Sequence, residues 1–479
     1  MRGYYRHTKI IATVGPATDS EEKLGQLITS GVDVLRLNMA HGSGDWAKTL
    51  IERVRRVSKA VGRHVAVMMD VKGPEIRTGV VETPIELSVG DQFEFYTDVP
   101  TPGMRGVSVN YPGLPTDVSV GATILVDSGL MRLQVQDLDA THVRCKVLTS
   151  GKLGSRRHVN LPGMMVNLPS LTEKDERDLR AGIEAGIDFV ALSFVRKSDD
   201  ILLLRDFLTS LGSKARIIAK IEDQSGVRNM HSIIKVTDAV MVARGDLGIE
   251  IDYHTLPLVQ TQMVDLCLKE GKPVIIATHL LESMISAAMP TRAEISDIST
   301  AVRERADAVM LSGETTTGQY PLECVDVMKN IVASIEPTEK RPFNETIELE
   351  QPKSKMLRAA TVLARELGES GIVVFTRSGS LAYTLAALRA VGVPIYAFTD
   401  DAETFRHMLL PWGVEPFLLP FSDDPEETVK NALATLKRQD WADDDTWLVV
   451  ITNVLAEGRI VDALQLRQVN AGPPNSRRD

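Results

Sequence analysis

The sequence predicts an α/β protein built on a (β/α)₈, or TIM, barrel, with a small β domain inserted into it and a separate C-terminal α/β domain. Three observations favour this fold class. Eight short apolar runs are too continuous for half-solvated strands, helical patterns separate most of them, and polar side chains gather near the C-terminal ends of seven runs. Any exposed strand end can be polar, but repetition in one direction indicates a single site at one face of a barrel.

The eight apolar runs predict the barrel strands in chain order. They are KIIATVG (9–15), VDVLRLNMA (32–40), HVAVMMD (64–70), IDFVALSF (187–194), ARIIAKIE (215–222), AVMVARGD (239–246), KPVIIATH (272–279) and ADAVMLSGE (306–314). Residues 19–31 predict a helix with Asp19 or Ser20 as N-cap and Gly31 after its end. Residues 171–186 predict another, because Thr172 and Asp175 have the spacing of a capping box.

Two interruptions of this pattern predict the domain organisation. The long gap between the third and fourth runs is rich in Gly, Pro and Asp and contains strand-like pieces, including QFEFYTD, ATILVD and MRLQVQDL. After the eighth run, a charged connection leads to alternating helix-like and strand-like segments such as IVVFT and PIYAFT. We therefore expect a barrel over 1–70 and 167–338, an inserted barrel-like β domain over 71–166 and an α/β domain over 339–479.

Charge and cysteine content exclude several classes of protein. The formal net charge of −10 disfavours an extended basic face for nucleic acid or anionic membrane. No apolar stretch approaches the length of a membrane span, and the apolar run at the start is too short for a signal peptide. Cys145, Cys267 and Cys324 have neither metal-site spacing nor an even count for disulfides, so we expect a reducing, cytoplasmic location.

Two pairs of charged residues at strand ends predict a metal site. Residues two apart on a strand share a face, so Lys220 should point the same way as Glu222, and Arg244 the same way as Asp246. Adjacent strands would bring the two carboxylates together, a donor set that suits Mg²⁺. The alternative is a structural Lys–Glu pair at the barrel rim, which would contribute little to stability.

Cationic side chains near the same ends indicate phosphate chemistry. They are Arg36, Lys72, Arg77, Lys174 and Lys220. No GxxxxGK[ST] motif is present, so the sequence does not predict a P-loop enzyme. Beside a metal ion, a lysine could neutralise the charge of a moving phosphoryl group or of an enolate.

Eight motifs in order resemble the pyruvate kinase family. They are TKIIATVGPAT (8–18), VLRLNMAHG (34–42), MMDVKGPEIRTG (68–79), IIAKIED (217–223), MVARGDLGIEI (241–251), ATHLLESM (277–284), PTRAEISD (290–297) and AVMLSGETTTGQYP (308–321). The resemblance is strong from the start of the sequence to about residue 335 and weaker after that. The chain resembles the bacterial members of the family. It implies that phosphoenolpyruvate and ADP give pyruvate and ATP at the last step of glycolysis, and that the inserted domain is a lid.

The resemblance also implies a role for individual residues. Lys220 and Arg36 would act on the phosphoryl group, and Thr278 and Ser312 would lie on the route of the proton that reaches the enolate carbon. Gly245 and Asp246, with Thr278 and Ser193, would contact the substrate. The metal, Mg²⁺ or Mn²⁺, would bind Glu222 and Asp246. The nucleotide would be contacted by Asn38, His41, Arg77 and Lys174.

Hydroxyl and imidazole side chains also admit simpler interpretations. Ser193 and Ser312 could each satisfy neighbouring backbone at a strand end. His41 could be a loop histidine that bonds only to backbone.

The resemblance implies a K⁺ site, from which this sequence departs. Asn38, Asp70 and the Val71 carbonyl would be ligands, but Ala40 stands where the family usually has serine. Glu75 is the residue type of K⁺-dependent members, and an unpaired Glu75 beside Asp70 would call for a cation. We therefore expect K⁺ to be required but bound more weakly than in relatives with serine.

Further departures occur elsewhere in the chain. His279 replaces a usual glutamine, and Arg303, Glu304 and Arg305 stand where the family more often has Asp-Gly. The final segment lacks the Gly-Thr-Asn pattern that usually completes the effector pocket.

The C-terminal domain carries a candidate effector loop. Thr376, Arg377, Ser378, Gly379 and Ser380 lie between a predicted strand and helix, where backbone N–H groups can bind phosphate. The resemblance implies a sugar-phosphate activator there, and a homotetramer; the alternative is an ordinary strand–helix turn.

Two other functions compete with the kinase. A metal-dependent TIM-barrel aldolase or lyase acting on pyruvate-like acids would share the carboxylate pair, but it would need neither the inserted domain nor the set Arg36, Arg77 and Lys174. A non-catalytic metabolite sensor would be expected to lack Lys220 or the carboxylate pair, and all three are present.

Overall fold

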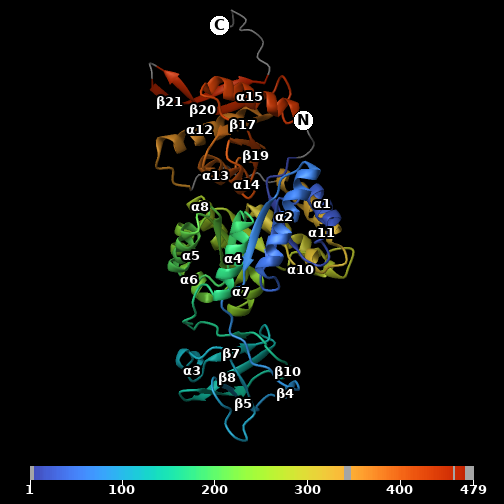
Figure 1. The fold of residues 1–479 in the computed structure, drawn as a ribbon, viewed down its shortest axis with the longest axis vertical. Helices are drawn as coiled ribbons and strands as arrows, with labels where there is room; N and C mark the ends of the chain where they lie inside the picture. Colours follow the sequence, from blue (N-terminus) through green and yellow to red (C-terminus); the bar gives the residue numbers. More distant parts are fainter. Residues whose placement is uncertain (1–4, 165, 339–346, 457–458, 470–479) are drawn as a thin grey trace, which may run out of the picture.

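The computed structural model describes residues 5–164, 166–338, 347–456 and 459–469 as three domains in a row. The barrel lies in the middle, the inserted β domain at one end and the C-terminal α/β domain at the other (Figure 1). Within the described residues no helix combines the length and the apolar character needed to cross a membrane. The proposed boundary between 338 and 339 borders residues outside the described ranges.

The central domain is a closed barrel of eight parallel strands, as predicted. All eight predicted runs form one strand each. The strands are β1 (Lys9–Val14), β2 (Val34–Asn38), β3 (Ala66–Val71), β12 (Phe189–Leu192), β13 (Arg216–Ile221), β14 (Ala239–Ala243), β15 (Val274–Ala277) and β16 (Ala308–Leu311). The ring closes where β1 pairs with β16.

Helices cover the outside of the barrel. They are α1 (Glu21–Ser30), α2 (Gly44–Val61), α4 (Glu173–Glu184), α5 (Ser198–Ser210), α6 (Gln224–Val236), α8 (Leu256–Glu270), α9 (Arg292–Arg303) and α11 (Pro321–Ile335). Two short helices, α7 (Arg244–Glu250) and α10 (Gly313–Thr316), instead follow the C-terminal ends of β14 and β16. Ser20, not Asp19, caps α1 by accepting from Lys23 N, and Gly31 ends that helix at φ 113°. The capping box of Thr172 and Asp175 is confirmed at α4.

The inserted domain is a separate β structure with its own apolar core. A six-stranded sheet has the order β11-β7-β8-β9-β5-β6, and β10 pairs with β4 beside it. The strands are β4 (Ile85–Leu87), β5 (Gln92–Tyr96), β6 (Gly106–Ser108), β7 (Thr123–Val126), β8 (Met131–Leu138), β9 (His142–Val147), β10 (Gly151–Leu153) and β11 (Val159–Asn160), and a short helix, α3 (Leu114–Asp117), joins β6 to β7. The three strand-like pieces read from the sequence are β5, β7 and β8.

The C-terminal domain is a five-stranded sheet of order β19-β18-β17-β20-β21 with helices packed on it. Only β21 is antiparallel to its neighbour. The elements are α12 (Pro352–Leu367), β17 (Ser370–Phe375), α13 (Ser380–Ala387), β18 (Ile395–Thr399), α14 (Ala402–His407), β19 (Val414–Leu418), α15 (Pro425–Arg438), β20 (Trp447–Ala456) and β21 (Arg459–Gln468).

The C-terminal domain closes the N-terminal mouth of the barrel. Phe405, Leu409 and Leu410 belong to the same apolar cluster as the inward-facing side chains of the barrel strands. Two arginines of this domain, Arg389 and Arg406, pair with the buried carboxylates of Asp307 and Asp188 at the starts of β16 and β12. Because breaking a buried ion pair leaves an uncompensated charge, these pairs hold the two domains in one arrangement.

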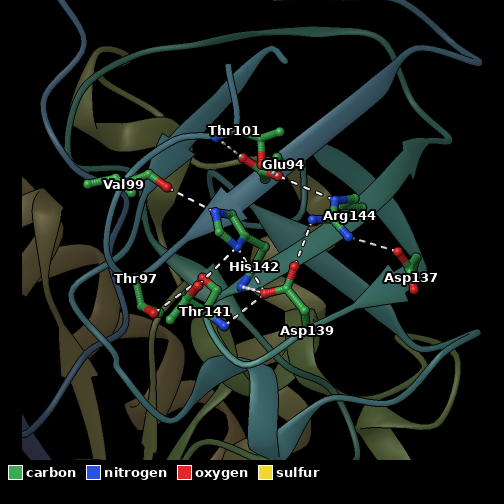
Figure 2. Close-up of polar contacts among 9 residues, drawn as sticks. All are labelled: Glu94, Thr97, Val99, Thr101, Asp137, Asp139, Thr141, His142 and Arg144. Atoms are coloured by element: carbon green, nitrogen blue, oxygen red, sulfur yellow. Dashed lines mark hydrogen bonds and ion pairs between the residues drawn. The ribbon is translucent and has the colours of Figure 1, made fainter. Parts of the chain in front are cut away.

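A histidine at the outer end of the inserted domain ties down the loop after β5 (Figure 2). The ring nitrogen Nε2 of His142 lies 2.9 Å from the Val99 carbonyl oxygen, and Nδ1 lies 2.9 Å from Asp139 Oδ1. Both partners can only accept, so the ring makes both bonds only when doubly protonated. The hydrogen bonds to Asp139 and Val99 raise the pKa of His142 above its usual 6.5.

Buried charge holds the other end of this loop. Glu94 is fully buried and accepts hydrogen bonds from the Thr101 backbone N–H at 3.0 Å and from its hydroxyl at 2.7 Å. Arg144 lies 3.5 Å from Glu94 and also pairs with Asp137 and Asp139, as Figure 2 shows.

The state of His142 should control how firmly this loop is held. Since the folded-state pKa is raised, the stabilisation is complete below pH 6.5 and is lost as pH rises through the folded pKa. We expect limited proteolysis within 97–105 to become about threefold faster above that pH, the equivalent of one weak hydrogen bond. His142→Gln should remove the pH dependence; a cleavage rate that rises equally in wild type and variant would contradict the assignment.

Candidate active site

A buried carboxylate lies between two cations at the C-terminal face of the barrel. Asp70 is the last residue but one of β3; its Oδ2 lies 2.7 Å from Arg36 Nε on β2, and its Oδ1 lies 3.0 Å from Lys220 Nζ on β13. Asp70 has a side chain only 2% exposed, and those of Arg36 and Lys220 are each 10% exposed. Arg36 also donates to the Thr13 hydroxyl at 3.0 Å. The two cations predicted to act on the phosphoryl group are therefore held together by one carboxylate.

Lys220 also contacts the first of the predicted metal ligands. Its Nζ lies 3.0 Å from Glu222 Oε1, so the prediction that they share a face is confirmed. Burial opposes the charge of Lys220, but Asp70 and Glu222 outweigh it and raise the pKa of the ammonium. Burial raises the pKa of Glu222 to about 7; Lys220 opposes this, and the negative charges of Asp246 and Asp70 add to it.

Arg244 and Asp246 do not share a strand face, so this prediction was wrong. β14 ends at Ala243, and Arg244 begins α7, so the two side chains leave the first turn of a helix in different directions. Arg244 turns into the protein, where it lies 2.7 Å from Asp297 Oδ1 and donates to the Thr278 carbonyl at 2.6 Å. Asp246 stays half-buried, and its carboxylate has no hydrogen bond or ion pair with any described residue.

Glu222 and Asp246 fit a divalent cation. The negative charge of Asp246, which has no partner among the described residues, raises the pKa of the buried Glu222 carboxylate. A positive ion bound by both carboxylates would relieve this repulsion. Among the described residues no group of three or more His, Cys, Asp or Glu side chains could hold a metal. Two carboxylates with open positions for water and substrate oxygens are a donor set of Mg²⁺.

Thr278 occupies a strained backbone turn next to α7. Both Thr278 and His279 are left-handed, with φ 66° and 58°, a conformation rare for a β-branched residue. The strained turn places the Thr278 hydroxyl to accept from Gly245 N–H at 2.8 Å and to donate to the Ala277 carbonyl at 2.6 Å. His279, the departure noted in the sequence, is exposed beside Gly245.

A cleft of about 730 Å³ opens beside Arg36 between the ends of β1, β2 and β16. Asn38, His41 and Ser312 from the predicted set line it together with Arg36. The Ser312 hydroxyl is buried without a hydrogen-bond partner in the described residues, so it is available to a ligand or water. Sequence reasoning missed other lining residues: Pro16, Asp19, Trp46, Thr316 and Thr317.

Lys174 and Arg77, the other predicted nucleotide residues, do not line this cleft. Lys174 donates to the carbonyls of Met39 and Gly42 at 3.0 and 3.1 Å, so it holds the loop that carries His41. Arg77 lies where the chain enters the inserted domain and donates to the Arg156 carbonyl at 2.8 Å.

Glu75 is not unpaired, so the expectation of an uncompensated anion was wrong. Its Oε2 lies 2.6 Å from Arg77 Nε and 3.1 Å from Lys72 Nζ. Burial raises the pKa of Glu75, but hydrogen bonds from Arg77 and Lys72 outweigh it and lower the pKa. Asp70 is paired as well, which removes the charge argument for a cation between the two.

The predicted K⁺ ligands lie side by side with their polar atoms engaged. Asn38 pairs with Asp70 in the register of β2 and β3, and Asn38 Oδ1 accepts from Ala40 N–H at 3.1 Å. The Val71 carbonyl accepts from the Ser193 hydroxyl at 2.7 Å, and that hydroxyl accepts from Lys220 at 2.7 Å. The hydroxyl of Ser193 is thus satisfied within the protein; its substrate contact stays a prediction.

The loop 376–380 lies beside a second cavity in the C-terminal domain, of about 370 Å³. Thr376 and Arg377 line it, with Lys353, Phe421 and Thr452 from elements that the sequence had not connected to the loop. Ser378, Gly379 and Ser380 do not line it. Ser378 instead offers its carbonyl to Arg216 Nη2 at 2.8 Å, so the loop contacts the start of β13.

Two further carboxylates hold the site in place. Glu314 accepts from Ser312 N–H at 2.7 Å and from Leu281 N–H at 3.1 Å, which ties the end of β16 to the strained turn after β15. Asp297 orients Arg244. Both lie in the quoted motifs SGE and AEISD, a signal that could have found them.

Comparisons with known proteins agree with this geometry. Residues 5–325 match the model of the pyruvate kinase barrel domain, and residues 354–460 match that of the pyruvate kinase alpha/beta domain. The chain is 42% identical over 441 residues to plastidial pyruvate kinase 2 of Arabidopsis thaliana, covering 91% of this chain and 76% of that protein. It is 41% identical over 437 residues to pyruvate kinase of Staphylococcus aureus strain MRSA252, covering 90% of this chain and 74% of that protein.

A solved structure is similar over nearly the whole length. The crystal structure of a pyruvate kinase from Cryptosporidium parvum superposes with a TM-score of 0.89 at 33% identity, covering 97% of this chain and 96% of that one. Sequence and fold agree: the chain belongs to the pyruvate kinase family, phosphotransferases that pass the phosphoryl group of phosphoenolpyruvate to ADP.

Proposed function

We propose that this chain performs the phosphoryl transfer of glycolysis with Arg36, Lys220, Glu222 and Asp246 as its central residues. The observation that carries the proposal is the position of Lys220, whose Nζ lies 3.0 Å from both Asp70 and Glu222 at the mouth of the barrel. A fixed cation next to a carboxylate pair suits the transfer of a negatively charged phosphoryl group.

The residues at this face of the barrel bind different parts of the substrate and the metal ion. Arg36 and Lys220 bind and neutralise the phosphoryl oxygens, and Lys220 then stabilises the enolate that remains. The Gly245 region binds the substrate carboxylate, since the absence of a side chain at Gly245 allows close approach. Mg²⁺ or Mn²⁺, held by Glu222 and Asp246, supplies further neutralisation of phosphate charge when bound.

The hydroxyl groups of Thr278 and Ser312 lie on the route by which the enolate carbon is protonated. Thr278 has its hydroxyl aligned by Gly245 N–H and the Ala277 carbonyl, and Ser312 has a hydroxyl without a protein partner in the described residues. We place a water between these hydroxyls as the proton source. ADP binds in the cleft lined by Asn38 and His41. Lys174 holds the loop that carries His41, and Arg77 moves toward the nucleotide with the inserted domain.

Regulation, assembly and location rest on family likeness. A sugar phosphate acting at residues 376–380 is supported by the cavity that Thr376 and Arg377 line and by Lys353 within it. A homotetramer working in the cytoplasm is proposed on the resemblance.

Replacing Lys220 tests the central role. Lys220→Met should lower turnover by about 10²–10³-fold, because it removes the charge that stabilises the moving phosphoryl group. Pyruvate formation measured with a lactate dehydrogenase couple gives the rate, and circular dichroism checks the fold. Lys197→Met, at an exposed lysine, is the matched control; turnover of Lys220→Met within tenfold of wild type would refute the role.

Replacing Asp246 tests the metal site. Asp246→Asn should raise the half-saturating Mg²⁺ concentration by about tenfold or more, since it removes one of two protein carboxylates. Mn²⁺ binding followed by electron paramagnetic resonance gives a readout independent of turnover. Asp252→Asn, on an exposed residue just after α7, is the control; unchanged Mn²⁺ affinity in Asp246→Asn would place the ion elsewhere.

Ala40 tests the monovalent site. We propose K⁺ at Asn38, Asp70 and Val71, supported now by their adjacency and the family rather than by unpaired charge. Ala40→Ser should lower the K⁺ concentration for half-maximal activity about two- to tenfold, because it adds one oxygen ligand of hydrogen-bond strength. Activity is compared in K⁺ and in tetramethylammonium at equal ionic strength; full activity in both, with no effect of Ala40→Ser, would rule the site out.

A further inference from the structure

The inserted domain contacts the C-terminal end of α7, the helix that carries Asp246. Asn160, at the end of β11, donates through Nδ2 to Glu250 Oε1 at 2.7 Å. Both residues are buried, with 3% and 7% of their surface exposed. At the neighbouring residue of α7, a Cβ on Gly129 of the β7–β8 loop would lie 3.4 Å from Ile249 Cγ2, so the domain touches α7 at two adjacent positions.

The other end of α7 is part of the active site. The helix spans only seven residues, from Arg244 to Glu250, and Gly245 and Asp246 lie in its first turn. Gly245 N–H is tied to Thr278, and the Glu250 carbonyl accepts from Gln224 Nε2 at 2.7 Å. A helix this short, held at both ends, transmits a displacement at Glu250 to Asp246 rather than absorbing it by bending.

Removal of Asn160 would leave the buried Glu250 carboxylate without a hydrogen-bond donor among the described residues. Among the described residues Asn160 is the only hydrogen-bond donor to the Glu250 carboxylate. Burial raises the pKa of Glu250 to about 7; the Asn160 hydrogen bond opposes this, and the negative charge of Asp223 adds to it. A buried carboxylate that loses its donor shifts toward water or takes up a proton, and either change disturbs the end of α7.

We propose that the Asn160–Glu250 hydrogen bond positions α7, so that the inserted domain, as it moves over the site, sets the place of Asp246. Asn160 and Glu250 are positioning residues and contact neither substrate nor metal. This inference rests on the proposed metal role of Asp246, and it links lid position to metal affinity through one bond. Lids of this kind complete a catalytic site when they close.

Asn160→Ala is the test. Turnover should fall about tenfold and the half-saturating Mg²⁺ concentration should rise by a similar factor, the range of one lost buried hydrogen bond to a charged group. The midpoint of thermal unfolding should stay within about 2 °C, because the two domains keep separate cores. Glu250→Gln should behave like wild type, since its amide oxygen still accepts from Asn160.

Matched variants separate positioning from folding. Thr97→Val removes a 3.3 Å hydrogen bond elsewhere in the inserted domain, to the Thr141 carbonyl, and should leave metal affinity unchanged. The double variant Asn160→Ala with Glu250→Ala should be no worse than the poorer single variant, as expected when one interaction is lost.

Several results would overturn the inference. Metal affinity and turnover of Asn160→Ala within twofold of wild type would do so, as would losses that merely follow a lowered unfolding midpoint. Whether Asp246 binds the metal is tested separately, by Mn²⁺ binding to Asp246→Asn. If that variant binds Mn²⁺ normally, the proposed function of Asp246 fails irrespective of Asn160.

Discussion

The active face of this barrel depends on one buried carboxylate with two cations. Asp70 accepts from Arg36 on one side and from Lys220 on the other, although Lys220 lies 150 residues away in the chain. Without it, two buried positive side chains would repel each other, and Arg36 would lose the carboxylate that compensates its burial. The arrangement also leaves Glu222 between Lys220 and a second carboxylate, the condition that favours a divalent ion.

The opposite ends of the strands use aspartates in another way. Asp33, Asp188, Asp238 and Asp307 each stand just before a barrel strand, and each accepts from a backbone N–H of the neighbouring strand at 2.7–2.9 Å. Each of these aspartates also pairs with an arginine. Asp188 and Asp307 pair with arginines of the C-terminal domain. The barrel thus has a structural face and a chemical face. Arg216 and Lys220 lie on the same strand, so β13 runs from the loop 376–380 to the active site.

Three of the nine described non-glycine residues with positive φ lie at the chemical face of the barrel. Phe194, Thr278 and His279 are left-handed at the ends of β12 and β15, and Phe194 N–H donates to Glu222 at 2.8 Å. Such conformations cost free energy and persist only where surrounding contacts enforce them. Here the bonds from Glu222, Gly245 and Arg244 enforce them, so stability is exchanged for the placement of hydroxyl and N–H groups.

The sequence alone determined the eight barrel strands, the domain order and the pairing of Lys220 with Glu222, because each depends on spacing along one segment. Apolar runs, caps and a two-residue offset are local properties, and quoted motifs located the residues near each strand end. Arg244 and Asp246 were misplaced because the strand ended at Ala243, three residues before the end of the predicted run, and the helix that followed turned the two side chains apart. Glu75 was thought unpaired because nothing local decides which way Lys72 and Arg77 point. Trp46, Lys353 and the Asn160–Glu250 bond were not found because each joins segments far apart in the chain, and only closure of the barrel and docking of the other two domains brings such groups within a few ångströms.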